Sequence, residues 1–259
     1  MNSKNKQYGV VILLDVLGAA ERIQRDLDSF LTDWNLVLNR LEENKRTLEQ
    51  ELSKGHYKTG IRTKDIFDNI QIFIPTDVPN TQYRDDTGGN SIWWTIQHSA
   101  DLLINLVRYA ITKNIFLRGC ISMGHIKEFR EAYYGKPVIE NAQFAESLDM
   151  IGVIAAPSST MVLRNKSYSS SPRFYYFIKY HVPINNPTRK RRKFFDRLTI
   201  LNLTRKSGIF DNINDKELEN KFQEQLLVHQ NNVVVRRKWE NTKSFIEYVP
   251  KITDENLFL

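Results

Sequence analysis

Apolar residues run almost without interruption from residue 8 to residue 16, a pattern typical of a buried central strand. Apolar positions then recur at helical spacing over residues 23–52, until Gly55 ends the pattern. The spacing therefore predicts one long helix that begins after the turn at Gly18.

Two short β-type runs, residues 60–66 and 69–74, flank the turn at Phe67 and Asp68 and predict a β-hairpin. Residues 76–90 are rich in turn formers and predict a loop. The remaining predicted helices are 91–113, 137–150, 157–163 and a tail from residue 215, and the remaining predicted strands are 115–126, 133–135, 151–156, 174–181 and 197–203.

This order of elements predicts an α+β fold with a ferredoxin-like βαββαβ core that is extended by further strands and helices. We expect residues 1–203 to form one domain, with a basic loop over 187–193, and residues 204–259 to form a C-terminal helical extension. Because many unrelated proteins share such a core, the function has to be argued from a site.

Composition excludes several classes of protein. No apolar run approaches the roughly 18–20 residues of a membrane-spanning helix, and the polar start has no apolar signal segment after it. The single cysteine, Cys120, excludes an internal disulfide and a thiolate metal cluster. We therefore expect a cytoplasmic protein that makes no contact with a membrane.

Positive charge is concentrated in the C-terminal part of the chain. Residues 1–150 carry 18 Lys and Arg against 20 Asp and Glu, and residues 151–259 carry 19 against 10, so net charges of −2 and +9 give the total of +7. The densest cluster comprises Arg189, Lys190, Arg191, Arg192 and Lys193. Such a cluster can bind nucleic acid, polyphosphate or an acidic partner, or it can be a solvated loop.

Two aspartates occupy positions suited to metal chemistry. Asp15 ends the first predicted strand, and Asp68 lies at the hairpin turn. Since the first strand of a ferredoxin-like sheet lies beside a hairpin strand, the two carboxylates are expected to converge. They would offer oxygen ligands to Mg²⁺ or Mn²⁺, and a bound triphosphate would complete the coordination. The alternative is that Asp15 only caps the helix and Asp68 only serves the turn.

The turn after Asp15 is a candidate for binding phosphate. Leu17, Gly18 and Ala19 lie between the predicted strand and the predicted helix, where backbone N–H groups and a helix N-terminus favour anions. The strand, the aspartate, the turn and the helix would then act together on a triphosphate.

Four motifs in order resemble the class III nucleotide cyclase homology domain, most of all the branch that includes the pyrimidine cyclases of the Pycsar antiphage systems. The motifs are LLDVLG at 13–18, IFDNIQIF at 66–73, LRGCISMG at 117–124 and YGKPVIENAQFAESL at 134–148. The resemblance covers about residues 8–156 and extends more weakly to residue 203.

The resemblance implies a specific activity. Asp15 and Asp68 match the two metal-binding catalytic aspartates, and the Val16 carbonyl matches a backbone ligand, so two Mn²⁺ or Mg²⁺ ions are expected. The substrate would be a nucleoside triphosphate, UTP or CTP, which is converted to its 3′,5′-cyclic monophosphate and pyrophosphate as an antiphage signal. Such cyclases work as head-to-tail homodimers.

Three further residues have a role only by this comparison. Lys64 matches a base-reading lysine, or it is an exposed edge-strand lysine; Arg118 supplies charge to the triphosphate or the dimer interface, or it pairs with a local carboxylate. Asn141 is displaced by one from the asparagine that orients the ribose, and Phe144 occupies the position of the transition-state arginine. These departures disfavour a purine cyclase. They leave open an inactive relative that binds nucleotide or nucleic acid through its basic C-terminal half.

Overall fold

The computed structural model describes residues 6–54, 60–76, 91–130, 132–164, 176–184, 194–205, 209–210 and 213–249. Its strands are β1 (Lys6–Val16), β2 (Arg62–Ile66), β3 (Asn69–Pro75), β4 (Leu117–Phe129), β5 (Ala132–Tyr134), β6 (Gly152–Ala155), β7 (Phe177–Ile184) and β8 (Phe194–Leu201). Its helices are α1 (Ala19–Arg25), α2 (Leu27–Lys54), α3 (Ser91–Thr112), α4 (Lys136–Ser147), α5 (Pro157–Arg164), α6 (Asp215–Val228) and α7 (Val233–Tyr248).

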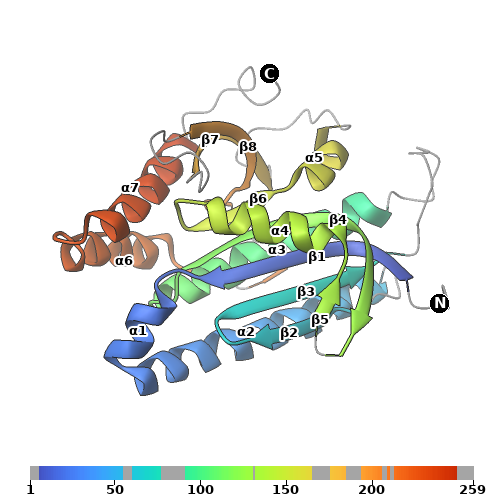
Figure 1. Cartoon of the computed structure of the whole chain (residues 1–259), viewed down its shortest axis with the longest axis horizontal. Helices are drawn as coiled ribbons and strands as arrows, with labels where there is room; N and C mark the ends of the chain where they lie inside the picture. The colour runs from blue at the N-terminus through green and yellow to red at the C-terminus, as the bar shows by residue number, and fades with distance from the viewer. Residues whose placement is uncertain are drawn as a thin grey trace.

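The strands form one sheet in the order β2-β3-β1-β4-β6-β8-β7, and β5 pairs with β4 (Figure 1). The first four strands of that order are antiparallel neighbours, and the chain passes from β1 through α1 and α2 to β2 and from β3 through α3 to β4. This is the ferredoxin-like βαββαβ arrangement, so the predicted α+β fold is confirmed. The parallel pairing of β4 with β6 adds the further strands.

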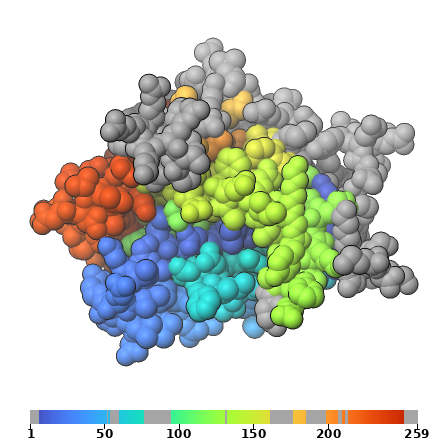
Figure 2. Space-filling view, viewed as in Figure 1, coloured from blue at the N-terminus to red at the C-terminus, as the bar shows by residue number. Residues whose placement is uncertain are grey.

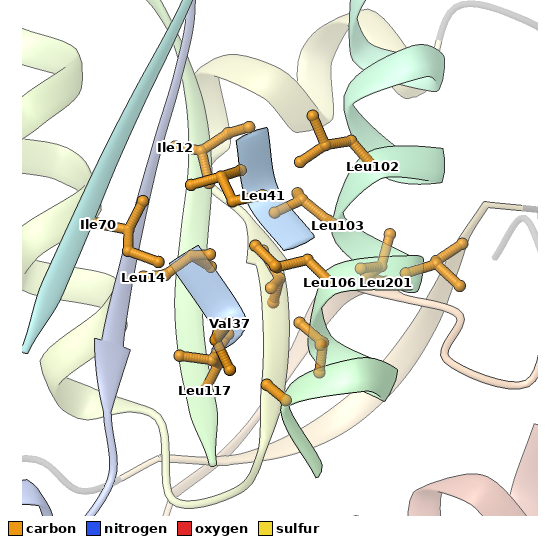
Figure 3. Close-up of a cluster of buried hydrophobic side chains, with 14 of the residues drawn as sticks. Ile12, Leu14, Val37, Leu41, Ile70, Leu102, Leu103, Leu106, Leu117 and Leu201 are labelled. Carbon is orange, nitrogen blue, oxygen red and sulfur yellow. The ribbon is translucent and has the colours of Figure 1, made fainter. Parts of the chain in front are cut away.

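Side chains of β1 alternate between two apolar layers, because successive residues of a strand face opposite sides of the sheet. Ile12 and Leu14 pack in the larger core cluster with residues of α2 and α3, among them Leu41 and Leu103 (Figure 3). Leu13 packs on the other face, in a smaller cluster that includes residues of α4. Asp15 lies on the same face of β1 as Leu13.

The C-terminal helices contribute to both layers of the core. Trp239 of α7 is fully buried, and its ring lies edge-on to Phe116 at 4.3 Å and to Phe222 of α6 at 5.1 Å. Phe245 of α7 packs in the smaller cluster, against Tyr180 of β7. The proposed division after residue 203 stays a prediction, although residues beyond it share their core with residues before it.

The predicted long helix is wrong in one respect, because it is interrupted at Asp26. This residue has an extended backbone, with φ −160° and ψ 90°, and it separates α1 from α2. Its carboxylate accepts a hydrogen bond from the Ser29 N–H at 3.0 Å, as an N-cap residue does, so a new helix begins there. Helical periodicity continues across the break, which is why the pattern concealed it.

Other boundaries moved by a few residues. The helix predicted to continue to residue 150 ends at Ser147, because Leu148 is extended and forms a bridge with Ile184. β4 continues to Phe129 and pairs there with β5. The basic cluster at 189–193 and most of the loop predicted at 76–90 lie outside the described residues. Within the described part, no helix has both the length and the apolar character needed to cross a membrane.

Candidate active site

Asp15 and Asp68 meet at one edge of the sheet. Asp15 lies opposite Asn69 in the antiparallel pairing of β1 with β3, directly beside the hairpin turn that holds Asp68. The Val16 N–H donates a hydrogen bond of 3.1 Å to the Asp68 carbonyl oxygen, which joins the end of β1 to that turn. The register of the sheet therefore brings together two carboxylates that are 53 positions apart in the chain.

The environment of Asp15 affects how readily its carboxylate ionises. Partial burial raises the pKa of Asp15 above its usual value, and the nearby negative charge of Asp68 raises it further. The guanidinium of Arg118 acts in the opposite direction without cancelling these effects on the pKa. A cation bound at this edge would favour the charged form of Asp15 and so lower its pKa.

Arg118 lies opposite Asp15 in the pairing of β1 with β4. Its Nε donates a hydrogen bond to Asp15 Oδ2 at 2.8 Å, and its Nη2 forms an ion pair with the same oxygen at 2.7 Å. Its Nη1 donates to the carbonyl oxygens of Glu146 and Leu148 at 3.1 and 3.4 Å. Arg118 is thus fixed between the sheet edge that holds Asp15 and the end of α4. Of the roles that the sequence left open for Arg118, the structure contains the pairing with a local carboxylate, that of Asp15.

The turn after β1 offers fewer phosphate donors than its sequence suggested. The Leu17 N–H donates to the Phe116 carbonyl oxygen at 2.8 Å, so it is already used. Gly18 is exposed and has a left-handed backbone with φ 73°, a conformation that glycine adopts without strain, whereas Ala19 is buried. Of the three predicted phosphate contacts, Gly18 is the most accessible.

Lys64 is not brought to this edge. Its ammonium pairs with Glu128 at 2.8 Å, donates to the Arg130 carbonyl oxygen at 3.1 Å and lies 4.8 Å from the centre of the Tyr133 ring. These contacts hold Lys64 at the β4–β5 hairpin, on the edge strand of the sheet. A local role explains its position fully.

Asn141 is also separate from the aspartates. It is fully buried beneath β1, where its Nδ2 donates to the Val11 carbonyl oxygen at 2.9 Å. Phe144, one helical turn further along α4, packs against the smaller core cluster. The position of Asn141 does not support the expected substrate contact, because a fully buried side chain cannot reach a ligand in this conformation.

Next to the aspartate edge is a cavity of about 940 Å³ that no sequence motif indicated. The cavity is lined by the turn after β1, with Val16, Leu17 and Gly18, by residues of α1 and α2, and by residues of α6 and α7 that include Lys238. In Figure 2 the red region of α6 and α7 lies beside the blue α1 region. The only trace of this cavity wall in the sequence is the basic run Arg236-Arg237-Lys238 before Trp239, and such a run is equally typical of a solvated helix face.

The protein's own ligands for a metal ion are few. Across the described ranges, no group of three or more His, Cys, Asp or Glu side chains could hold an ion. The candidate site provides two carboxylates instead. A metal ion there would need further oxygen ligands from the backbone and from a phosphate-bearing substrate.

Comparisons with known proteins give similarities of fold only. No protein-family model matches the chain, and no curated protein does. Among solved structures, the catalytic core of a rhodopsin-guanylyl cyclase with converted specificity is 13% identical, with a TM-score of 0.43, over 76% of this chain and 96% of that one. A bacterial light-regulated adenylyl cyclase is 12% identical, with a TM-score of 0.43, over 90% of this chain and 58% of that one.

A class III adenylyl cyclase-like ATP-binding protein from Pseudomonas aeruginosa is 10% identical, with a TM-score of 0.33, over 95% of this chain and 43% of that one. The chain therefore spans less than two thirds of the length of two of these three proteins. At these values the likenesses carry no argument about activity, which we base on the residues of the chain itself.

Proposed function

We propose that this protein is a metal-dependent nucleotide cyclase that converts UTP or CTP to the 3′,5′-cyclic monophosphate and pyrophosphate. One observation carries the proposal: Asp15 and Asp68, each within a motif that resembles the class III cyclases, converge at the same edge of a ferredoxin-like sheet.

The reaction is an internal phosphoryl transfer. The 3′-oxygen of the ribose forms a bond to the α-phosphorus, and the bond from that phosphorus to the bridging oxygen of the β-phosphate breaks. The hydroxyl proton leaves to solvent, and pyrophosphate departs with the electron pair. Such a reaction depends mainly on positioning and on neutralising negative charge.

Asp15 and Asp68 would hold two Mn²⁺ or Mg²⁺ ions, with the Val16 carbonyl as a further ligand. When bound, these ions supply charge neutralisation at the triphosphate and activation of the 3′-hydroxyl. Arg118 would orient the Asp15 carboxylate through a hydrogen bond from Nε and an ion pair from Nη2. Gly18 is exposed beside this edge and would allow phosphate to approach the backbone.

A pyrimidine substrate is favoured by what replaces the purine-cyclase residues. Phe144 stands where those enzymes have the transition-state arginine, and Asn141 is turned into the core. The resemblance to the Pycsar branch supports a role for the product as an antiphage signal.

A head-to-tail homodimer belongs to the same proposal. Three large apolar side chains, Phe129, Tyr134 and Ile139, are each more than half exposed on β4, β5 and α4. Exposed apolar side chains of this size are typical of surfaces that are covered by a partner. Their positions support an interface that includes the β4–β5 hairpin and α4.

The test is to incubate the purified chain with each of the four nucleoside triphosphates and Mn²⁺, and to identify products by mass spectrometry. We expect cyclic UMP or cyclic CMP, and at least a hundredfold loss of rate for Asp15→Asn and Asp68→Asn. Asp65→Asn is the matched control, because Asp65 is exposed on β2 and faces the other side of the sheet. Absence of cyclic product with all four substrates would contradict the proposal.

A second candidate is an inactive relative that binds nucleotide or nucleic acid. It is favoured by the pairing of Asp15 with Arg118, which already satisfies that carboxylate, and by the buried Asn141. It predicts salt-sensitive binding of RNA or DNA that weakens when Arg189, Lys190, Arg191, Arg192 and Lys193 are neutralised, together with no turnover of any triphosphate.

A further inference from the structure

Helix α7 is fixed next to the aspartate edge by contacts on several of its residues. Arg237 Nε pairs with Asp149 at 2.6 Å, and Asn241 Nδ2 donates to the Asp149 carbonyl oxygen at 2.8 Å. Thr242 Oγ1 accepts the Ile151 N–H at 2.9 Å. The position of α7 relative to the strand ends is therefore defined by directed polar bonds as well as by apolar packing.

These contacts place Lys238 at the cavity beside the turn that follows Asp15. Lys238 lines this cavity together with Val16 and Gly18, while its neighbour in the chain, Trp239, packs edge-on against Phe116. An element outside the ferredoxin-like core thus presents a cation to the turn where phosphate is expected.

The charge of Lys238 has no direct partner in the described part of the chain. No carboxylate oxygen lies within 4 Å of its ammonium there, whereas Arg22, another cation of the cavity, pairs with Asp33. Partial burial lowers the pKa of Lys238, with a further lowering by the charge of Arg118, while the carboxylates of Asp149 and Asp15 act in the opposite direction. A half-buried ammonium without a partner is costly, and an arriving anion would recover that cost.

We infer that Lys238 contacts the triphosphate of the substrate, so that the C-terminal extension forms part of the nucleotide site. This inference rests on the proposed cyclase function. An ammonium binds phosphate oxygens as a compact positive charge. In the reaction described above, Lys238 neutralises the charge that develops on the departing pyrophosphate, and it takes no part in bond formation or proton transfer.

The test compares triphosphate binding with monophosphate binding in the full chain. Isothermal titration calorimetry with Mg²⁺ would use the α,β-methylene analogues of UTP and CTP, which cannot be cyclised, and then UMP and CMP. We expect Lys238→Met to weaken triphosphate binding at least tenfold and monophosphate binding less than twofold. Lys238→Arg, which keeps the charge, should remain within about threefold of the unmodified chain.

Lys243→Met is the matched control, because Lys243 is on the same helix and is paired with Glu247 at 3.7 Å. It should change neither affinity. Thermal unfolding provides an independent readout, since removal of an unpaired half-buried charge should leave the melting temperature of Lys238→Met unchanged or higher. A purely structural role, such as balancing Asp149, predicts a lower melting temperature and equal losses for the two classes of nucleotide.

Each outcome decides the inference. Equal losses for triphosphate and monophosphate, or no loss with Lys238→Met, would overturn it while leaving the cyclase proposal intact. If the unmodified chain binds no nucleoside triphosphate, the proposed function fails and the inference fails with it. If Lys238→Met does not fold, the role of Lys238 is structural and the inference fails. If Lys238→Arg binds triphosphate more than tenfold more weakly than the unmodified chain does, a simple charge contact is contradicted as well.

Discussion

At the scale of single residues, the candidate site is centred on Asp15, whose pKa is raised by some neighbouring groups and lowered by others. Burial and Asp68 raise the pKa of Asp15, and Arg118 lowers it. The net direction is upward, so the folded chain binds a proton at Asp15 more readily than the unfolded chain does. Stability from this group therefore increases as the pH falls through the raised pKa, and the effect ends below the ordinary value of 3.8.

The substitution Asp68→Asn should lower the pKa of Asp15, because it removes a neighbouring negative charge that disfavours ionisation. The measurement is a carbon-13 NMR titration of the Asp15 carboxyl group in the metal-free chain. Asp65→Asn should leave that titration unchanged. An Asp15 pKa that stays the same or rises in Asp68→Asn would show that the two carboxylates do not interact.

The pairing of Arg118 with Asp15 should contribute measurably to stability. Both side chains are mostly buried, with exposed fractions of 17% and 22%, so Arg118→Gln leaves a carboxylate without its counter-ion. We expect a loss of about 1–3 kcal/mol in the free energy of unfolding, less than for a fully buried pair. Chemical denaturation at pH 7 measures it.

Arg236→Gln serves as the comparison, because Arg236 and Glu240 form an ion pair on α7 with about half of each side chain exposed. Its loss should cost less than about 0.5 kcal/mol. Equal effects of the two substitutions would mean that the Arg118 pair is no stronger than a surface pair.

At the scale of elements, the site depends on how closely β1 approaches its neighbours. Gly119 of β4 lies against the backbone of β1, where an added Cβ would overlap the Leu13 carbonyl oxygen and come within 2.6 Å of Leu14 Cδ2. Its neighbours in the chain are Arg118 and Cys120, which both point to the α4 side. The close contact at Gly119 thus supports the strand pairing that places Arg118 opposite Asp15.

Gly119→Ala should therefore destabilise the chain by about 2–4 kcal/mol, because the obstructing atoms include backbone that cannot move without disturbing the pairing of β1 with β4. Gly60→Ala is the control, since a Cβ at Gly60 meets no atom within 4 Å. Denaturant unfolding of both variants checks the difference. A Gly119→Ala chain as stable as Gly60→Ala would mean that the two strands separate easily.

At the scale of the whole molecule, the C-terminal helices behave as part of the fold. Leu218, Phe222 and Trp239 belong to the larger core cluster, and Phe245 and Val249 belong to the smaller one. Helices that share two apolar clusters with the sheet are expected to unfold with it.

Trp239→Ala should lower the stability of the entire chain by about 3–5 kcal/mol, because it removes a fully buried ring that joins α7 to Phe116, just before β4, and to Phe222 of α6. Val233→Ala, at an exposed position at the start of the same helix, should have little effect. Calorimetry should give one transition for each protein. Two separate transitions, only one of them shifted by Trp239→Ala, would establish an independent C-terminal domain.

The sequence was sufficient for the core of the fold because periodicity reports local structure directly. The alternation of Ile12 and Leu13 between two apolar layers and the hairpin at Phe67 and Asp68 both follow from short-range patterns. The interruption at Asp26 did not, because a capping aspartate in a charged helix resembles any other surface aspartate.

At the candidate site, topology predicted the meeting of Asp15 with Asp68, since it depends on which strands are neighbours. The contacts of Lys64 and Asn141 could not be predicted, because they depend on which groups lie within reach of each side chain in the folded structure. Lys238 was not predicted as a site residue for a related reason. Its place at the cavity depends on the docking of α7, which no local pattern encodes.

The residue-by-residue match of β1 with β4 from Lys6 to Val16 has a consequence for how the protein matures. A displacement of one position would turn Asp15 toward the apolar layer under α2 and α3, and would place a side chain where only the hydrogens of Gly9 and Gly119 fit. Misregistered intermediates therefore lack the carboxylate pair altogether. Affinity for a divalent cation should therefore appear late in refolding, when β1 completes its pairing with β4. Its appearance would mark the time at which β1 reaches its native register.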